Sequence, residues 1–126
     1  MNFPEELKYT KSHEWLLDNG DDTFTVGITD FAQDALGDLV FANLPEEGDP
    51  VTAEEPFGDV ESVKAVSDVM SPVTGEVVAI NEELFDAPEL INNDPYGAWF
   101  IKVANVTDTE ELLDAGAYEE FCATEE

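Results

Sequence analysis

Two short runs of small and β-branched residues flank a tight turn, and this pairing constrains the fold more than any other feature of the chain. Both runs lie within residues 57–72, and neither carries the hydrophobic stripe of a helix. The turn between them closes on Val63-Lys64-Ala65-Val66. The pattern predicts a β-hairpin with Lys64 at its tip, where two paired strands present a side chain with little backbone freedom.

Lys64 is one of only four basic residues in the chain. A lysine on an exposed hairpin is most often simply solvated. A lysine at a tip also suits covalent attachment, because its ε-amine can be acylated and its four-carbon stem adds reach. From these residues alone both interpretations stay open. All four basic residues are lysines, namely Lys8, Lys11, Lys64 and Lys102.

The length of 126 residues and the 43% hydrophobic content predict one folded domain that spans residues 1–126. The chain contains no run of about 18 apolar residues, so the sequence predicts no membrane span. The first residues form neither a basic leader nor an apolar signal core, so we expect a cytoplasmic protein. The single cysteine, Cys122, excludes an internal disulfide and a cysteine-cluster metal site, and His13 has no partner at metal-ligand spacing. We therefore expect no metal, a partly buried thiol at Cys122 and a structural role for His13.

The formal charge of −27 is far from the magnitude of about 2–8 that is usual for a small domain. Acidic residues are scattered through the whole chain rather than gathered in a tail. Because salt screens their mutual repulsion, we interpret them as adaptation to a salty prokaryotic cytoplasm. Nucleic acid and anionic membranes are poor partners for such a surface.

Local patterns predict a mainly β chain with short helices. Residues 24–28 alternate like a half-buried strand, and Thr29 caps a helix from Asp30 to Leu36 that stops at Gly37. Thr74-Gly75 predicts a turn before a strand at residues 76–80. Further strands are expected at residues 7–9, 15–17, 39–42 and 99–103, and the aromatic core at Phe24, Phe41, Phe57, Trp99 and Phe100.

The C-terminal part of the chain carries two helix signals. Residues 107–110 match a capping box, which predicts a helix through Leu112 and Leu113. A second short helix is expected around Tyr118 and Phe121.

A weak internal repeat aligns residues 37–43 with 75–81, and residues 57–61 with 99–103. Short, closely spaced strands in two similar halves predict two small sheets packed face to face, each half contributing to both. In this arrangement Lys64 lies near the boundary of the halves, at one end of the molecule.

Several motifs resemble a known family. Glu61-Ser62-Val63-Lys64-Ala65, followed by residues 71–75, resembles a lipoyl-attachment hairpin. Residues 9–15, 27–38 and 90–97 are similar to signatures of the glycine cleavage system H-protein family, and the resemblance covers nearly the whole chain. It implies a barrel-sandwich hybrid of two small antiparallel sheets, of the lipoyl/biotinyl type, with short peripheral and C-terminal helices.

The resemblance also implies a function, that of a carrier and not an enzyme. Lipoate is expected in amide linkage to Lys64, attached by a lipoate ligase or a lipoyl/octanoyl transferase. The carrier takes an aminomethyl group from a pyridoxal-phosphate glycine decarboxylase (P-protein) to a tetrahydrofolate-dependent aminomethyltransferase (T-protein). A flavin-dependent dihydrolipoyl dehydrogenase (L-protein) then reoxidises the dithiol. Family residues that match Ser12, Glu14 and Asp68 contact the aminomethyl group in a surface cleft, and relatives are mostly monomers.

Three points remain open at this stage. A lipoate relay protein, or a lipoyl domain serving 2-oxoacid dehydrogenases, would keep the same hairpin, although the Ser-His-Glu-Trp segment and the C-terminal helix signals disfavour the lipoyl domain. An acidic interaction protein would leave the lysine unmodified. Phe31 and Ala35 stand where relatives carry more polar residues, often histidine, which leaves the cleft lining on this helix open.

Overall fold

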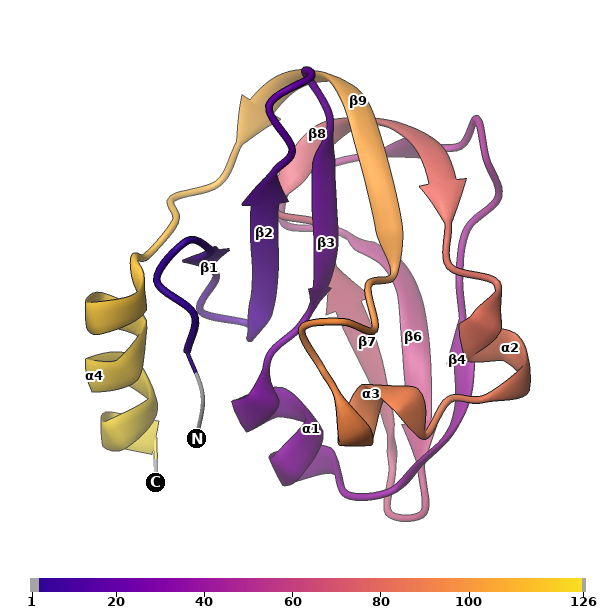
Figure 1. Ribbon diagram of the computed structural model, residues 1–126, viewed down its shortest axis with the longest axis vertical. Helices are drawn as coiled ribbons and strands as arrows, with labels where there is room; N and C mark the ends of the chain where they lie inside the picture. Colours follow the sequence, from indigo (N-terminus) through magenta and orange to yellow (C-terminus); the bar gives the residue numbers. More distant parts are fainter. Residues whose placement is uncertain (1–2, 126) are drawn as a thin grey trace.

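The computed structural model describes residues 3–125, which form two antiparallel β-sheets with four short helices around them (Figure 1). The three-stranded sheet has the order β4-β6-β7, and the six-stranded sheet the order β1-β2-β3-β9-β8-β5. The strands are β1 (Lys8–Tyr9), β2 (Glu14–Asp18), β3 (Phe24–Ile28), β4 (Leu39–Asn43), β5 (Pro50–Val51), β6 (Pro56–Ser62), β7 (Val66–Met70), β8 (Val73–Ile80) and β9 (Ile101–Thr109).

The helices lie at the periphery, as expected. Helices α1 and α3 sit side by side near the end of the molecule from which the β6–β7 hairpin projects, and α4 packs beside β1 (Figure 1). Their bounds are α1 (Asp30–Leu36), α2 (Glu83–Asp86), α3 (Leu90–Asn93) and α4 (Ala115–Glu125). Among the described residues, none of these helices is long and apolar enough to cross a membrane.

The main core consists of apolar side chains from both sheets, with Val26 and Val103 on the larger sheet and Val60 and Val69 on the smaller one. Strand β5 comes from the first half of the chain and joins the larger sheet, whereas β7 comes from the second half and joins the smaller. The prediction of two sheets to which both halves contribute is therefore confirmed.

The predicted hairpin is present as β6 and β7, which pair Glu61 with Val66 and Val60 with Ser67. The Ser62 hydroxyl accepts hydrogen bonds from the backbone N–H groups of Lys64 and Ala65, each at 3.1 Å. The Ser62 N–H donates to the Ala65 carbonyl at 2.8 Å. These bonds fix the three-residue tip, as short turns stabilised by serine commonly do.

Helix α1 also agrees with the prediction at both ends. The Thr29 side chain accepts a hydrogen bond from Ala32 N, and Gly37 ends the helix with a φ of 84°. That φ lies in the left-handed region, which glycine adopts without steric cost.

Strand β3 is buried on both faces, so its prediction as a half-buried strand was wrong. Gly27 pairs with Trp15, and a Cβ at Gly27 would lie 2.6 Å from the indole ring. The indole therefore covers the face that would otherwise meet water, and Thr25 is buried as well.

The turn predicted at Thr74-Gly75 was also wrong, because both residues lie within β8. A Cβ at Gly75 would lie 2.6 Å from the Ala104 carbonyl oxygen on β9. The register shifts between Thr74 and Glu76. Gly75 thus allows two strands to approach closely at a bulge.

The capping-box helix over residues 107–113 does not form. Strand β9 continues to Thr109, which pairs with Val73, and Glu110 N donates to the Pro72 carbonyl at 2.9 Å. Leu113 then exchanges two backbone hydrogen bonds with Tyr9. Partners distant in sequence therefore supply the hydrogen bonds that a local helix would have made. The second predicted helix is confirmed, since α4 contains Tyr118 and Phe121.

Phe41 is 48% exposed, so its assignment to the core was wrong. A bulge between Leu39 and Phe41 shifts the register of β4 and leaves Phe41 on the outer face of the smaller sheet. Phe100 is fully buried, and the other three aromatic residues assigned to the core are half-buried.

Candidate functional site

Lys64 is exposed at the tip of the β6–β7 hairpin. The Val63 N–H donates to the Asp38 carbonyl at 3.1 Å, which ties the tip to the segment after α1. The lysine side chain lies over Gly37, since a Cβ at Gly37 would be 3.4 Å from Lys64 Cε. The amine is therefore presented on a fixed backbone, and its stem follows the C-terminal end of α1.

Glu14, the first residue of β2, is the most buried acidic residue among those described, with 2% of its surface exposed. Its Oε1 accepts hydrogen bonds from Thr10 Oγ1 at 2.7 Å and from Ser12 Oγ at 2.5 Å. Its Oε2 accepts one from Met70 N at 3.3 Å, at the end of β7. Through these hydrogen bonds the carboxylate connects the turn that carries Ser12 with the end of β7, the strand that follows Lys64.

Burial raises the pKa of Glu14 to about 7. Desolvation disfavours the charged carboxylate, whereas hydrogen bonds from Ser12, Thr10 and Met70 partly counteract this effect. The neighbouring Glu110 adds like-charge repulsion, which also raises the pKa. Glu14 is thus partly ionised near neutral pH.

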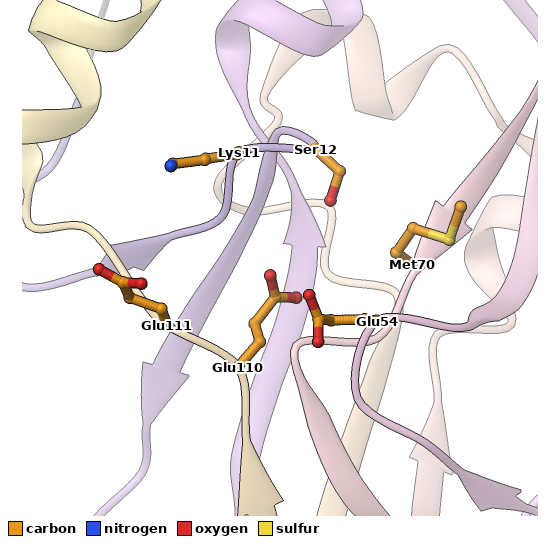
Figure 2. Close-up of a pocket in the computed structure, with 6 residues that line it drawn as sticks. All are labelled: Lys11, Ser12, Glu54, Met70, Glu110 and Glu111. Carbon is orange, nitrogen blue, oxygen red and sulfur yellow. The ribbon is translucent and has the colours of Figure 1, made fainter.

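A cleft of about 450 Å³ is lined in part by Ser12 and Met70, the residues that donate to the Glu14 carboxylate, whereas Glu14 itself does not line it (Figure 2). The Ser12 hydroxyl and the carboxylates of Glu54 and Glu110 point toward a common space, whereas the Lys11 side chain extends away from it. Met70 forms another wall. The cleft is lined by Lys11, Ser12, Glu54, Met70, Glu110 and Glu111.

Glu110 is a feature of the cleft that the sequence did not reveal. Its Oε1 is buried and has no hydrogen-bond partner among the described residues. Burial and the charge of Glu54 raise the pKa of Glu110. Sequence patterns placed Glu110 in a helix cap, and no local signal separates Glu54 or Glu110 from the other acidic residues of so acidic a chain.

Asp68 lies on β7 between Lys64 and Met70, paired with Asp59. Because side chains alternate along a strand, Asp68 and Met70 share the outer face while Val69 points into the core. Asp68 is exposed, and none of the hydrogen bonds described for Ser12 or Glu14 involves it. The structure therefore brings Ser12 and Glu14 together and leaves Asp68 beside the path from Lys64 to the cleft.

The two residues on α1 that left the cleft lining open have different surroundings. Phe31 is half-buried and stacks on His13 with ring centroids 4.6 Å apart. Ala35 is exposed. Neither of them lines the cleft beside Glu14.

Comparison with known proteins gives consistent matches. The family model for the glycine cleavage H-protein matches residues 7–125. A glycine cleavage system H protein of Marinomonas sp. (strain MWYL1) is 61% identical over 118 residues, covering 91% of this chain and 93% of that protein. The corresponding protein of Lachnoclostridium phytofermentans is 57% identical over 125 residues, covering 99% and 98%.

A solved structure agrees as well. The crystal structure of a glycine cleavage system H protein from Mycobacterium marinum superposes with a TM-score of 0.85 and 41% identity, covering 97% of this chain and 98% of that one. This match confirms the predicted fold. The comparisons lend no support to salt adaptation, which stays a prediction. The chain belongs to the glycine cleavage H-protein family, whose members are non-catalytic carriers that move an aminomethyl group on a covalently attached lipoyl group.

Proposed function

We propose that Lys64 is the lipoyl-bearing residue and that Ser12, Glu14 and Asp68 hold the aminomethyl cargo beside the cleft. The observation that carries this proposal is the placement of an exposed lysine and a buried carboxylate at opposite ends of one strand, β7. When bound, the lipoyl group supplies a disulfide that accepts the aminomethyl group and is reduced to the dithiol level.

The surroundings of Lys64 fit such an attachment. The tip is held by the Ser62 hydrogen bonds and by the bond from Val63 to Asp38. An attaching enzyme therefore meets an exposed amine on a fixed backbone without unfolding any part of the core. Acylation removes the charge of Lys64, and the loss costs little stability because a charge on an exposed hairpin contributes little to folding.

The surroundings of Glu14 fit a cationic cargo. An ionised carboxylate offers about four acceptor positions, and three described donors already use Glu14. This count leaves about one acceptor position, which an ammonium group would reach from the side of Ser12 and Met70, because Glu14 is 2% exposed and does not itself line the cleft. A cation there would lower the pKa of Glu14 from about 7 and favour the ionised form, so cargo and carboxylate would stabilise each other's charge.

The partners follow from the carrier role. The proposed binding partners at Lys64 are glycine decarboxylase (P-protein), the aminomethyltransferase (T-protein), dihydrolipoyl dehydrogenase (L-protein) and the lipoate-attaching enzyme. Since the carrier has a charge of −27, we expect basic side chains on the surfaces that receive it. We also propose that residues 1–126 act as one monomeric unit. Tethering gives each docked partner a high effective concentration of cargo.

The proposal is tested by reconstitution with glycine decarboxylase. Lipoylated protein should support glycine-dependent exchange of bicarbonate, and Lys64→Arg should abolish the exchange while keeping the same melting temperature. Lys8→Arg is the matched control, because Lys8 is also exposed but lies on β1. Retained exchange in Lys64→Arg would contradict the attachment site. A lipoylated protein that supports no exchange would favour the lipoate relay.

A further inference from the structure

The hydroxyl group of Tyr118, on the C-terminal helix, contacts His13 in the turn that carries the proposed cargo-binding residues Ser12 and Glu14. Tyr118 is fully buried on α4, and its hydroxyl lies 2.8 Å from His13 Nδ1 and 2.7 Å from Thr29 Oγ1. His13 stands between Ser12 and Glu14 in the chain, and Thr29 caps α1. One hydroxyl therefore connects α4, the turn and the start of α1.

The turn has an unusual backbone that depends on such support. His13 has a φ of 72°, in the left-handed region that residues other than glycine adopt infrequently. Its carbonyl accepts a hydrogen bond from Thr29 N at 3.1 Å, and its ring stacks on Phe31 at 4.6 Å. Ser12 and Glu14, on either side of His13, depend on this conformation for their mutual hydrogen bond.

The tyrosine is itself rigidly held. Its ring stacks on Tyr9 with centroids 4.6 Å apart and planes 6° from parallel, and Phe3 packs edge-on against it at 5.4 Å. Tyr9 is the last residue of β1 and directly precedes the turn. The hydroxyl of Tyr118 therefore has little freedom to leave His13 and Thr29.

The hydrogen-bond chain can be satisfied throughout. Thr29 Oγ1 accepts from Ala32 N, which leaves its own hydrogen available for the Tyr118 oxygen. The Tyr118 hydrogen is then available for His13 Nδ1 in the tautomer in which this nitrogen is the acceptor, and Cys122 is a further side-chain partner of the same hydroxyl. Removing the tyrosine hydroxyl takes this partner from Thr29, which is buried, and from His13, which is half-buried, and such a loss is costly for polar groups.

We infer that Tyr118 is a positioning residue for the cargo site, because its hydroxyl holds His13 in the conformation that aligns Ser12 with Glu14. The inference rests on the proposed function of Ser12 and Glu14. It assigns to the C-terminal helix a role in cargo retention in addition to its packing.

The chain offers a matched pair of variants for the test. Tyr118→Phe and Tyr9→Phe each remove one hydroxyl from the same stacked ring pair, in which both residues are fully buried. The Tyr9 hydroxyl donates to the Pro4 carbonyl at 2.6 Å and does not touch the turn. A general loss of packing or stability should therefore affect both variants, whereas a loss of positioning should affect only Tyr118→Phe.

Two measurements distinguish the outcomes. Lipoylated protein loaded with the aminomethyl group should release it about fivefold faster in Tyr118→Phe, which is the effect of losing one hydrogen bond, and at the wild-type rate in Tyr9→Phe. In the unlipoylated protein, we expect the carboxyl carbon resonance of Glu14 to titrate near pH 7, and this midpoint should move up in Tyr118→Phe alone, because Glu14 loses the hydrogen bond from Ser12 that lowers its pKa. Equal release rates and equal Glu14 midpoints in the two variants would overturn the inference.

The test remains informative if one component fails. If the wild-type protein accepts no aminomethyl group, the proposed function is wrong, and the Glu14 titration alone decides the role of Tyr118. Should Tyr118→Phe not fold, as judged by urea denaturation, His13→Phe takes its place. This variant keeps a ring against Phe31 and removes the nitrogen that contacts Tyr118. It should reproduce the higher Glu14 midpoint, and an unchanged midpoint would refute the inference.

Discussion

Replacing Glu14 by glutamine should change the pH dependence of stability in a way that follows from the burial of this one carboxyl group. The pKa of Glu14 is about 7 in the folded chain, against an ordinary value of 4.5. Between these two values the folded state binds more protons than the unfolded state, so stability falls as pH rises. The stabilising contribution is complete below about pH 4.5 and is lost as the pH passes through about 7.

The magnitude follows from the difference of about 2.5 between the two pKa values. At 1.36 kcal/mol for each pKa unit, the full effect is about 3 kcal/mol, most of which falls between pH 5 and pH 8. The conversion is appropriate here because Glu14 is only 2% exposed and solvent screens it little. Glutamine has the same shape and does not titrate.

The assay is urea denaturation of wild type and Glu14→Gln at several pH values, at one high salt concentration. Subtracting the two free energies of unfolding removes the contribution of the other acidic residues, which both proteins share. The wild type should lose about 2 to 3 kcal/mol relative to Glu14→Gln from pH 5 to pH 8. A constant offset between the two profiles would show that Glu14 is not shielded from water, and our reasoning about the cleft would be wrong.

Three further predictions concern packing, the cleft and the surface charge. Gly27→Ala should destabilise the fold by about 2 kcal/mol, because its Cβ would meet the Trp15 ring. Gly116→Ala in α4 should be neutral or stabilising by up to about 1 kcal/mol, and equal unfolding free energies for the two variants would contradict this reasoning. Glu110→Gln should speed release of the aminomethyl group severalfold without loss of thermal stability, and an unchanged release rate would remove Glu110 from the site. Thermal stability should rise between low and multimolar salt, and a flat melting temperature would show that charge repulsion is not limiting.

Local signals predicted those elements whose stabilising contacts are also local. Helix α1 is bounded by Thr29 and Gly37, which act on groups within the helix itself. The hairpin tip is held by Ser62, two residues from Lys64. In both places the residues that determine the conformation lie within a few positions of it, so the sequence pattern is sufficient.

Predictions failed where partners distant in sequence determine the conformation. Residues 107–110 carry a good capping box, but pairing of β9 with Val73 and the bond from Glu110 to Pro72 replace the helix. A bulge in β4, which depends on its pairing with β6, leaves Phe41 exposed.

The candidate site was predictable only in part, for a similar reason. Ser12 and Glu14 lie two residues apart within a motif that resembles the family signature, so the resemblance, and not the residue types alone, pointed to both of them together. Glu54 and Glu110 reach the same cleft from distant parts of the chain. With 31 acidic residues present, charge alone does not distinguish these two from the rest.

The central claim is that Lys64 carries the lipoyl group, and peptide mass mapping of protein from lipoate-supplied cells tests it most directly. All four lysines compete as acceptors in this experiment, so the other three serve as internal controls. The account predicts the lipoyl mass increment on the peptide that contains Lys64 and on no other. An unmodified Lys64, or a lipoyl increment on Lys8, Lys11 or Lys102, would contradict it.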